Sequence, residues 1–172
     1  MILRVAWLSV ALILGGCFGS EDKSERRTAE TTTHGAVSTQ SSSESKPCPV
    51  TRANGNLPPG ETATPGSRYL GNGALWTVLY PTPLRPRAED VHNDGSIEIK
   101  VPWWRGVVGR LTIAGRRLDT TAPPASAWIP TGYGRTGFQS SAVTFPTPGC
   151  WEVTGRAGGA SLTFINLILE PA

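Results

Sequence analysis

Residues 149–165 read GCWEVTGRAGGASLTFI and predict a β-hairpin. Residues 150–154 and 161–169 are rich in β-branched, aromatic and other large apolar residues, which favour strands. The small, glycine-rich segment between them suits a tight turn. We therefore expect two antiparallel strands near the end of the chain.

Other segments, which precede this hairpin in the chain, alternate between apolar and polar residues as strands do. Residues 97–101, IEIKV, place three apolar side chains on one face and two charged side chains on the other. Residues 110–113, RLTI, repeat this alternation, and we expect Gly115 to end that strand. Residues 74–80 and 138–145 are further strand candidates. Helix should be scarce, because no segment combines helical spacing with capping residues.

Several short strands separated by turns are typical of a β-sandwich or a small barrel. We favour an all-β, Ig-like β-sandwich, with another small β-sandwich or barrel as the alternative. Residues 145–155, FPTPGCWEVTG, resemble the last hairpin of bacterial Ig-like sandwiches. In those sandwiches, Pro-Gly leads into the penultimate strand and an aromatic residue follows.

The N-terminal residues 1–16 are typical of an export signal. Arg4 precedes an apolar run over residues 5–14, whereas a membrane-spanning helix needs roughly 20 such residues. Residues 14–17, LGGC, resemble the bacterial lipobox. This resemblance implies that Cys17 carries a diacylglyceryl group, becomes the first residue of the mature chain and anchors it to a membrane.

A polar segment follows the lipid-bearing cysteine. Residues 18–47 are rich in serine and threonine and contain almost no large apolar side chain, so they cannot offset the entropy cost of ordering. We expect a cleaved signal peptide over residues 1–16 and a disordered tether over residues 17–47. The chain should lie in the cell envelope, on the outer face of the cytoplasmic membrane or in an outer membrane if the host has one.

The remaining residues, 48–172, are enough for one domain with one core. Cys48 and Cys150 are the cysteines of this domain. An even pair in an exported chain predicts a disulfide. A two-cysteine metal site is the alternative, but His92 is the only histidine that could add a ligand there.

Four segments of the domain resemble blocks of an uncharacterised family of exported bacterial proteins. These segments are GNGALWTVLYP (71–81), DGSIEIKVPWWRGVVGRLTIAGRRLD (94–119), GYGRTGFQSS (132–141) and FPTPGCWEVTG (145–155). The resemblance covers nearly all of the domain. It implies an exported setting and a disulfide-bearing architecture, and it implies no activity.

The sequence offers little for catalysis. A serine or cysteine nucleophile needs a nearby base, and His92 lies beside a predicted turn. The chain contains no Gly-x-Ser-x-Gly and no phosphate-binding glycine loop, and its acidic residues cannot be paired from sequence for glycosidase chemistry. We expect no enzymatic activity and keep an unrecognised hydrolase as an alternative.

Glu89, Asp90, His92 and Asp94 form the densest group of oxygen and nitrogen ligands. Calcium prefers such oxygen atoms, but the spacing differs from that of an EF-hand, and Asp94-Gly95 is a common turn pair. We favour a solvated loop over a metal site, and expect no cofactor.

Trp103 and Trp104 are adjacent, so in a strand they point to opposite faces, and one of them can be exposed. An exposed tryptophan beside polar residues stacks on sugars or anchors a protein partner. Trp128 and Tyr133, which we expect in loops, could join such a site. The favoured alternative is that a tryptophan of the pair covers the core or the disulfide, as in Ig domains.

Trp76 and Trp151 are expected in the core. The net charge of +3 is modest, and no run of basic residues alternates with aromatic ones, so a nucleic-acid partner is not expected. The sequence predicts a non-catalytic, membrane-anchored binding module for a protein or a cell-wall partner. The alternative is a carbohydrate-binding or solute-sensing domain. Sugar binding predicts a coplanar row of exposed aromatic rings, and a protein partner predicts a mixed apolar patch with a polar rim.

Overall fold

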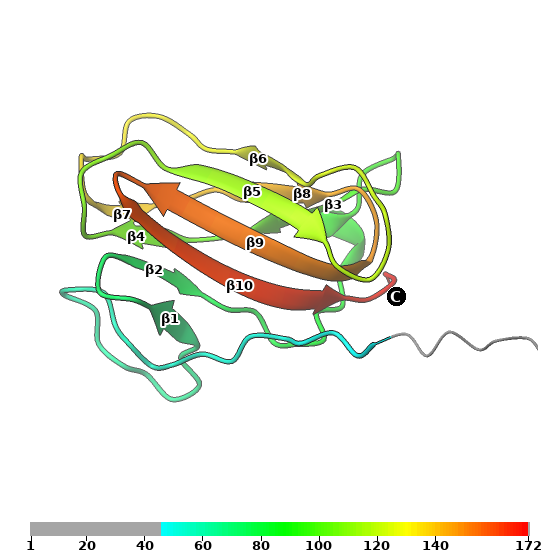
Figure 1. The fold of residues 1–172 in the computed structure, drawn as a ribbon, viewed down its shortest axis with the longest axis horizontal. Helices are drawn as coiled ribbons and strands as arrows, with labels where there is room; N and C mark the ends of the chain where they lie inside the picture. Colours follow the sequence, from blue (N-terminus) through cyan, green and yellow to red (C-terminus); the bar gives the residue numbers. More distant parts are fainter. Residues whose placement is uncertain (1–45, 172) are drawn as a thin grey trace, which may run out of the picture. The chain divides into compact units, whose positions relative to one another are not determined.

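A computed structural model of the chain describes residues 46–171 (Figure 1). The predicted signal peptide, the lipid-bearing Cys17 and residues 17–45 of the predicted tether lie outside this range. Within residues 46–171, no helix has the length and apolar character needed to cross a membrane.

The described residues form ten β-strands and one short 3-10 turn, η1 (Ala88–Asp90). The strands are β1 (Tyr69–Gly71), β2 (Leu75–Val78), β3 (Ile97–Lys100), β4 (Trp103–Arg105), β5 (Thr112–Arg117), β6 (Ser126–Trp128), β7 (Gly137–Gln139), β8 (Ala142–Phe145), β9 (Gly149–Ala157) and β10 (Ala160–Ile168).

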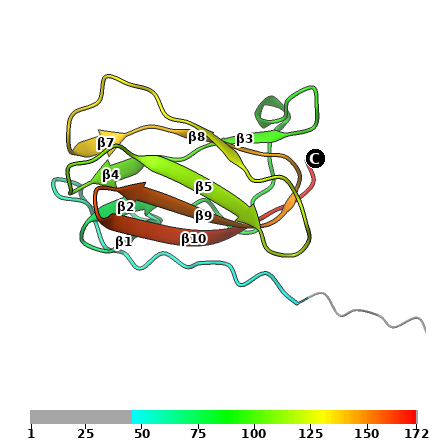
Figure 2. The same cartoon turned by 45° about the horizontal axis from the view of Figure 1, so that its top comes forward.

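The strands pair antiparallel in three sheets, with the orders β1-β2-β4-β7, β10-β9-β5 and β3-β8-β6. In Figures 1 and 2 the β10-β9-β5 sheet forms one layer. In the other layer β3 leads into β4 and β7 leads into β8, so two of the sheets follow one another end to end. The predicted all-β class is confirmed, and its Ig-like subtype stays a prediction.

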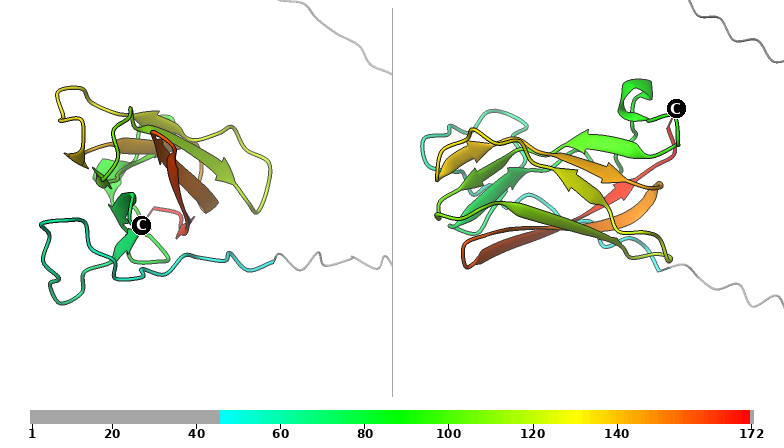
Figure 3. Two further views of the ribbon diagram at one scale, coloured as in Figure 1. Left: turned by 60° about the vertical axis from the view of Figure 1, so that its left-hand side comes forward. Right: turned by 90° about the horizontal axis from the view of Figure 1, so that it is seen from above.

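The C-terminal hairpin is confirmed and is longer than predicted. β9 and β10 pair from Gly149 opposite Ile168 to Ala157 opposite Ala160, and Figure 3 shows the two strands side by side. Gly158 in the connecting turn has φ 55°, in the left-handed region that glycine adopts without strain.

The prediction of one strand over residues 138–145 is wrong. β7 and β8 belong to different sheets, and the ladder breaks opposite Pro102, which has no N–H to donate. Two hydrogen bonds hold the junction: the Val101 N–H donates to the Ser141 carbonyl (2.9 Å), and the Ser141 hydroxyl donates to the Val101 carbonyl (2.7 Å).

The sequence led us to expect that Gly115 ends its strand. This prediction is wrong, because β5 continues to Arg117. Gly115 pairs with Val153 on one side and forms a bridge with Ala125 on the other. A Cβ on Gly115 would lie 2.8 Å from the Cβ of Ala125, so the glycine allows the two backbones to approach.

The core lies between the two layers. Trp151, from β9, is fully buried as predicted and meets Phe145 edge-on with ring centroids 5.4 Å apart. Trp103, from β4, is also fully buried and packs near Phe164 of β10. Trp76 is buried too, but it does not belong to the core cluster.

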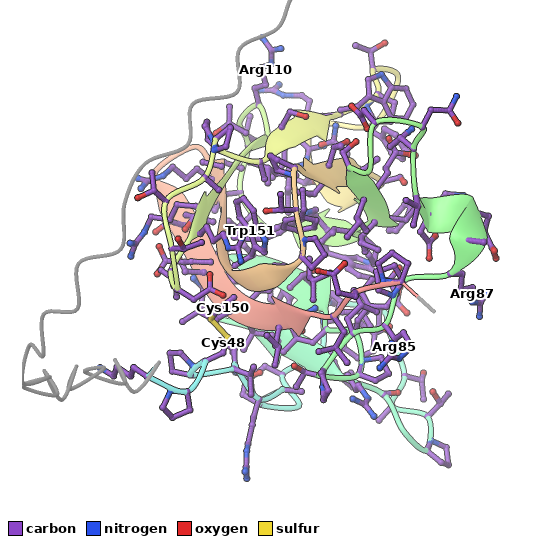
Figure 4. The ribbon with its side chains drawn as sticks, turned by 90° about the vertical axis from the view of Figure 1, so that its right-hand side faces the viewer. Cys48, Arg85, Arg87, Arg110, Cys150 and Trp151 are labelled. Atoms are coloured by element: carbon purple, nitrogen blue, oxygen red, sulfur yellow. A yellow bond between two sulfur atoms is a disulfide. The ribbon has the colours of Figure 1, made fainter. Side chains whose placement is uncertain are left out.

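The predicted Cys48–Cys150 disulfide is present, with the two Cα atoms 5.6 Å apart (Figure 4). It joins the start of the domain to the start of β9. Next to it, the Thr51 N–H donates to the Ile165 carbonyl (2.9 Å), and the Ile165 N–H donates to the Thr51 hydroxyl (2.8 Å). The N-terminal segment thus covers part of the free edge of β10, an edge that would otherwise be open to pairing with another chain.

Candidate functional site

Trp103 and Trp104 point to opposite faces of β4, as predicted. Trp103 lies in the core with no exposed surface, so its ring cannot meet a ligand, and we withdraw it as a binding candidate. Trp104 is half-buried and faces outward.

The outward face of the β1-β2-β4-β7 sheet carries large aromatic side chains. Trp76 lies opposite Trp104, and Trp104 lies opposite Phe138. Residues directly opposite each other in antiparallel strands share a face. The outer face of a sandwich is ordinarily polar, whereas Phe138 leaves 46% of its surface exposed here.

Four aromatic side chains form a continuous chain of contacts across this face. The ring centroids of Tyr69 and Trp104 are 5.5 Å apart, those of Trp104 and Phe138 are 5.2 Å apart, and those of Tyr133 and Phe138 are 6.0 Å apart. The planes of each pair are inclined by 65° to 68°, the edge-to-face geometry that aromatic rings favour. We call Tyr69, Trp104, Tyr133 and Phe138 the aromatic surface.

Glu61 fixes one end of the aromatic surface. Its carboxylate accepts hydrogen bonds from the Trp104 indole N–H (3.1 Å) and the Tyr69 hydroxyl (3.3 Å). Desolvation by burial, the larger cause, and the negative charge of Glu61, the smaller one, raise the pKa of Tyr69 above its ordinary value of 10.0. The Tyr69 hydroxyl therefore keeps its proton at neutral pH and remains a hydrogen-bond donor.

Trp76 lies beside the aromatic surface because two glycines leave room for its ring. A Cβ on Gly71 would overlap the Trp76 indole, and a Cβ on Gly106 would lie 2.9 Å from its Cζ3 atom. A side chain at either glycine would displace this indole.

Trp128 lies in a strand, β6, and not in the loop that the sequence predicts. Its side chain is 66% exposed and lines a cavity of about 390 Å³ between the start of β5 and β6. A second cavity, of about 370 Å³, is lined by Arg105, Tyr133 and Gln139. The two cavities share Arg110, Leu111 and Ile129 as lining residues, so they adjoin.

We call these two cavities the arginine groove. The Gly115–Ala125 bridge joins β5 to the residue that precedes β6, and residues 110–113 and 127–129 line the cavity at Trp128. Tyr133 lies in a loop, as predicted, and belongs to both the groove and the aromatic surface.

Arg105 is the buried charge of the groove, with only 6% of its surface exposed. Its Nη1 donates to the Gly109 carbonyl (2.8 Å), and its Nη2 donates to the Gly134 carbonyl. Within residues 46–171, its Nε has no hydrogen-bond partner and no carboxylate lies within ion-pair distance of its guanidinium. A buried cation without a counter-charge is unfavourable.

Gln139, on the neighbouring strand, contributes a second incompletely satisfied group. Its Nε2 donates to the Pro130 carbonyl (3.2 Å), whereas its buried Oε1 has no partner among the described residues. Sequence reasoning missed Arg105 and Gln139. The signal was available for Arg105, because alternation along Trp103-Trp104-Arg105 places the arginine on the same inward face as Trp103.

The acidic residues of the weak metal candidate are used in turns. Asp90 accepts a hydrogen bond from the Arg87 N–H (2.9 Å), and Glu89 lies beside it in η1. Asp94 accepts hydrogen bonds from the hydroxyl and the N–H of Ser96, which hold the pKa of Asp94 below its ordinary value of 3.8. Among residues 46–171, no three histidine, cysteine or acidic side chains group as metal ligands would.

His92 lies on a cavity of about 690 Å³. Its Nε2 is 3.8 Å from a carboxylate oxygen of Glu98. No serine, threonine or cysteine is among the residues that line this cavity. A nucleophile activated by His92 would therefore have to come from elsewhere, and the hydrolase alternative gains no support here.

Comparison with protein-family models, with curated proteins and with solved structures found no match for this chain. The resemblance to a family of exported bacterial proteins stays a prediction.

Proposed function

We propose that this chain is an exported lipoprotein, held to a membrane through Cys17, that acts as a non-catalytic binding module for a protein partner. The observation that carries the proposal is the aromatic surface, three large rings on the outward face of a sheet in contact with a fourth, Tyr133, from a loop. Tryptophan and tyrosine are among the residues enriched at the energetic centres of protein interfaces.

The inclination of the rings favours a protein over a flat glycan. A sugar-stacking platform requires exposed rings that are close to coplanar, whereas neighbouring rings here are inclined by 65° or more. A charged residue, Glu61, lies beside the aromatic side chains and is hydrogen-bonded to two of them. A mixed apolar patch with a polar rim is the arrangement of a protein interface.

The surface is also preorganised. The hydrogen bond to Glu61 and the edge-on contacts on both sides restrict the Trp104 indole before any partner arrives. Side chains that are already ordered lose less conformational entropy on binding.

The test is site-specific photo-crosslinking of the full lipidated chain in its native membrane. A photoreactive amino acid replaces Phe138, and in a matched control it replaces Val108, which is exposed but lies outside the aromatic surface. We expect a discrete protein adduct from position 138 and none from position 108. The purified partner should then bind the Phe138→Ala variant about tenfold or more weakly than the parent.

Two results would contradict the protein-binding proposal. One is equal crosslinking from positions 138 and 108. The other is retention of the parent on insoluble cell-wall glycans that is lost in a folded Trp104→Ala variant, which would favour a glycan partner.

The membrane anchor has its own test. Cells fed a clickable palmitate analogue should label the parent, and Cys17→Ser should abolish the label, because the thioether to the diacylglyceryl group needs the cysteine sulfur. Labelling that persists in Cys17→Ser would overturn the anchoring proposal without affecting the proposal for the aromatic surface.

A further inference from the structure

We propose that the arginine groove binds an acidic saccharide, with its carboxylate or phosphate group on Arg105 and Arg110 and a sugar ring against Trp128. This site goes beyond the protein partner proposed above and does not depend on it. The two surfaces use different residues, apart from Tyr133 at their junction.

Arg105 supplies the reason for a negative ligand. Arg105 is more than nine-tenths buried, and its guanidinium donates two hydrogen bonds to neutral carbonyls, those of Gly109 and Gly134. Those bonds orient the side chain but leave its charge without a counter-ion among residues 46–171. A carboxylate or phosphate oxygen would neutralise this charge in a partly desolvated position, where charge-assisted hydrogen bonds are strong.

The lining of the groove is positively charged, which suits a negatively charged ligand. Arg110 is exposed and lines both cavities, and no acidic residue lines either one. Figure 4 shows Arg110 at the outer margin of the domain, where a ligand in solution can reach it. Two arginines without an opposing carboxylate favour an anion with the planar or tetrahedral oxygen geometry that a guanidinium recognises.

Trp128 supplies the reason for a saccharide rather than a free anion. Its indole is largely exposed, yet β6 fixes its backbone beside the cavity. Thr112 and Thr131 are also among the lining residues, one in each cavity. An apolar ring face beside hydroxyl groups suits a sugar ring, which has both apolar C–H and polar O–H faces.

The experiment uses the full lipidated chain in detergent micelles, with 5-fluorotryptophan incorporated and ¹⁹F NMR as the readout. The Trp128 signal is assigned by its disappearance in Trp128→Phe. Four probes are titrated: a tetrasaccharide containing glucuronate, glucose 6-phosphate, neutral chitotetraose and inorganic phosphate. The first two separate a carboxylate from a phosphate as the recognised group.

We expect at least one acidic saccharide to shift the Trp128 signal, and chitotetraose to leave it unchanged. Arg110→Gln should weaken that binding by about tenfold or more, the effect of losing a favourable charge-assisted contact. The matched control is Arg156→Gln, an exposed arginine on β9 that does not line the groove, and it should bind as the parent does.

Several outcomes would overturn the inference. These are no shift with either acidic saccharide, an equal shift with chitotetraose, equal weakening in Arg156→Gln, or inorganic phosphate binding as tightly as the acidic saccharides. Arg105→Gln is the direct test of the buried charge. Should that variant fail to fold, Arg110→Gln decides the question, because Arg110 is exposed.

Discussion

The indole of Trp103 packs directly on the backbone of Gly155, across the interface between the two layers. A Cβ on Gly155 would overlap the indole, lying only 2.8 Å from its Cζ2 atom. The absence of a side chain at Gly155 of β9 therefore leaves the space that the Trp103 indole of β4 occupies.

Gly155→Ala should destabilise the domain by about 1–3 kcal/mol, because overpacking displaces a fully buried ring. Urea unfolding followed by far-UV circular dichroism measures the change. Gly159→Ala is the matched control, since a Cβ there meets no atom within 4 Å. Equal unfolding midpoints for the parent and Gly155→Ala would mean that the ring has room to move.

Trp103→Ala and Trp128→Ala should differ sharply in stability. The first leaves a cavity in the core and should cost about 3–5 kcal/mol. The second changes a side chain that is mostly in solvent and should change stability by no more than about 0.5 kcal/mol. Chemical denaturation of both variants checks this, and a large loss for Trp128→Ala would assign that residue to packing.

Reduction of the Cys48–Cys150 disulfide should lower the free energy of unfolding by about 2–4 kcal/mol, because the bond closes a long loop in the unfolded chain. The measurement is urea unfolding with and without reductant. A variant with both cysteines replaced should not respond to reductant. An unchanged midpoint in the reduced parent would show that the bond adds no stability.

Asp119 should stabilise the domain at neutral pH and lose that effect in acid. The Arg117 guanidinium, which donates to Asp119 (2.7 Å), and the Cys150 N–H hold the pKa of Asp119 below its ordinary value of 3.8. A lowered folded-state pKa contributes stability above the unfolded pKa, and this contribution is lost as the pH falls through the folded value.

Asp119→Asn should therefore be less stable than the parent at neutral pH, by less than about 1 kcal/mol because the pair is partly solvent-screened. The difference should shrink below about pH 4 and disappear at lower pH. Paired urea titrations across this range measure it. A difference that stays constant into strong acid would exclude ionisation of Asp119 as its source.

The sequence predicted the parts of the fold that depend on neighbouring residues. The hairpin of β9 and β10 follows from two β-rich runs around a glycine turn, and Cys48 could pair only with Cys150 once Cys17 was assigned to a lipid. Trp151 was expected in the core and is fully buried there. Each of these inferences needed only local pattern and residue type.

The wrong predictions have tertiary causes. The break between β7 and β8 arises opposite Pro102, a residue some forty positions earlier in the chain, so local alternation could not reveal it. β5 continues past Gly115 because Arg116 and Arg117 stay paired with Glu152 and Trp151 of β9. The arginine groove was invisible because it requires Arg105, Arg110 and the loop after β6 to meet.

The position of the disulfide also determines how the domain bears mechanical load. Tension applied through the chain that precedes Cys48 passes across the sulfur–sulfur bond to Cys150, at the start of β9. The residues between the two cysteines form a closed covalent loop and cannot be pulled straight. The force therefore enters the domain at β9, a strand that pairs with β5 on one side and with β10 on the other.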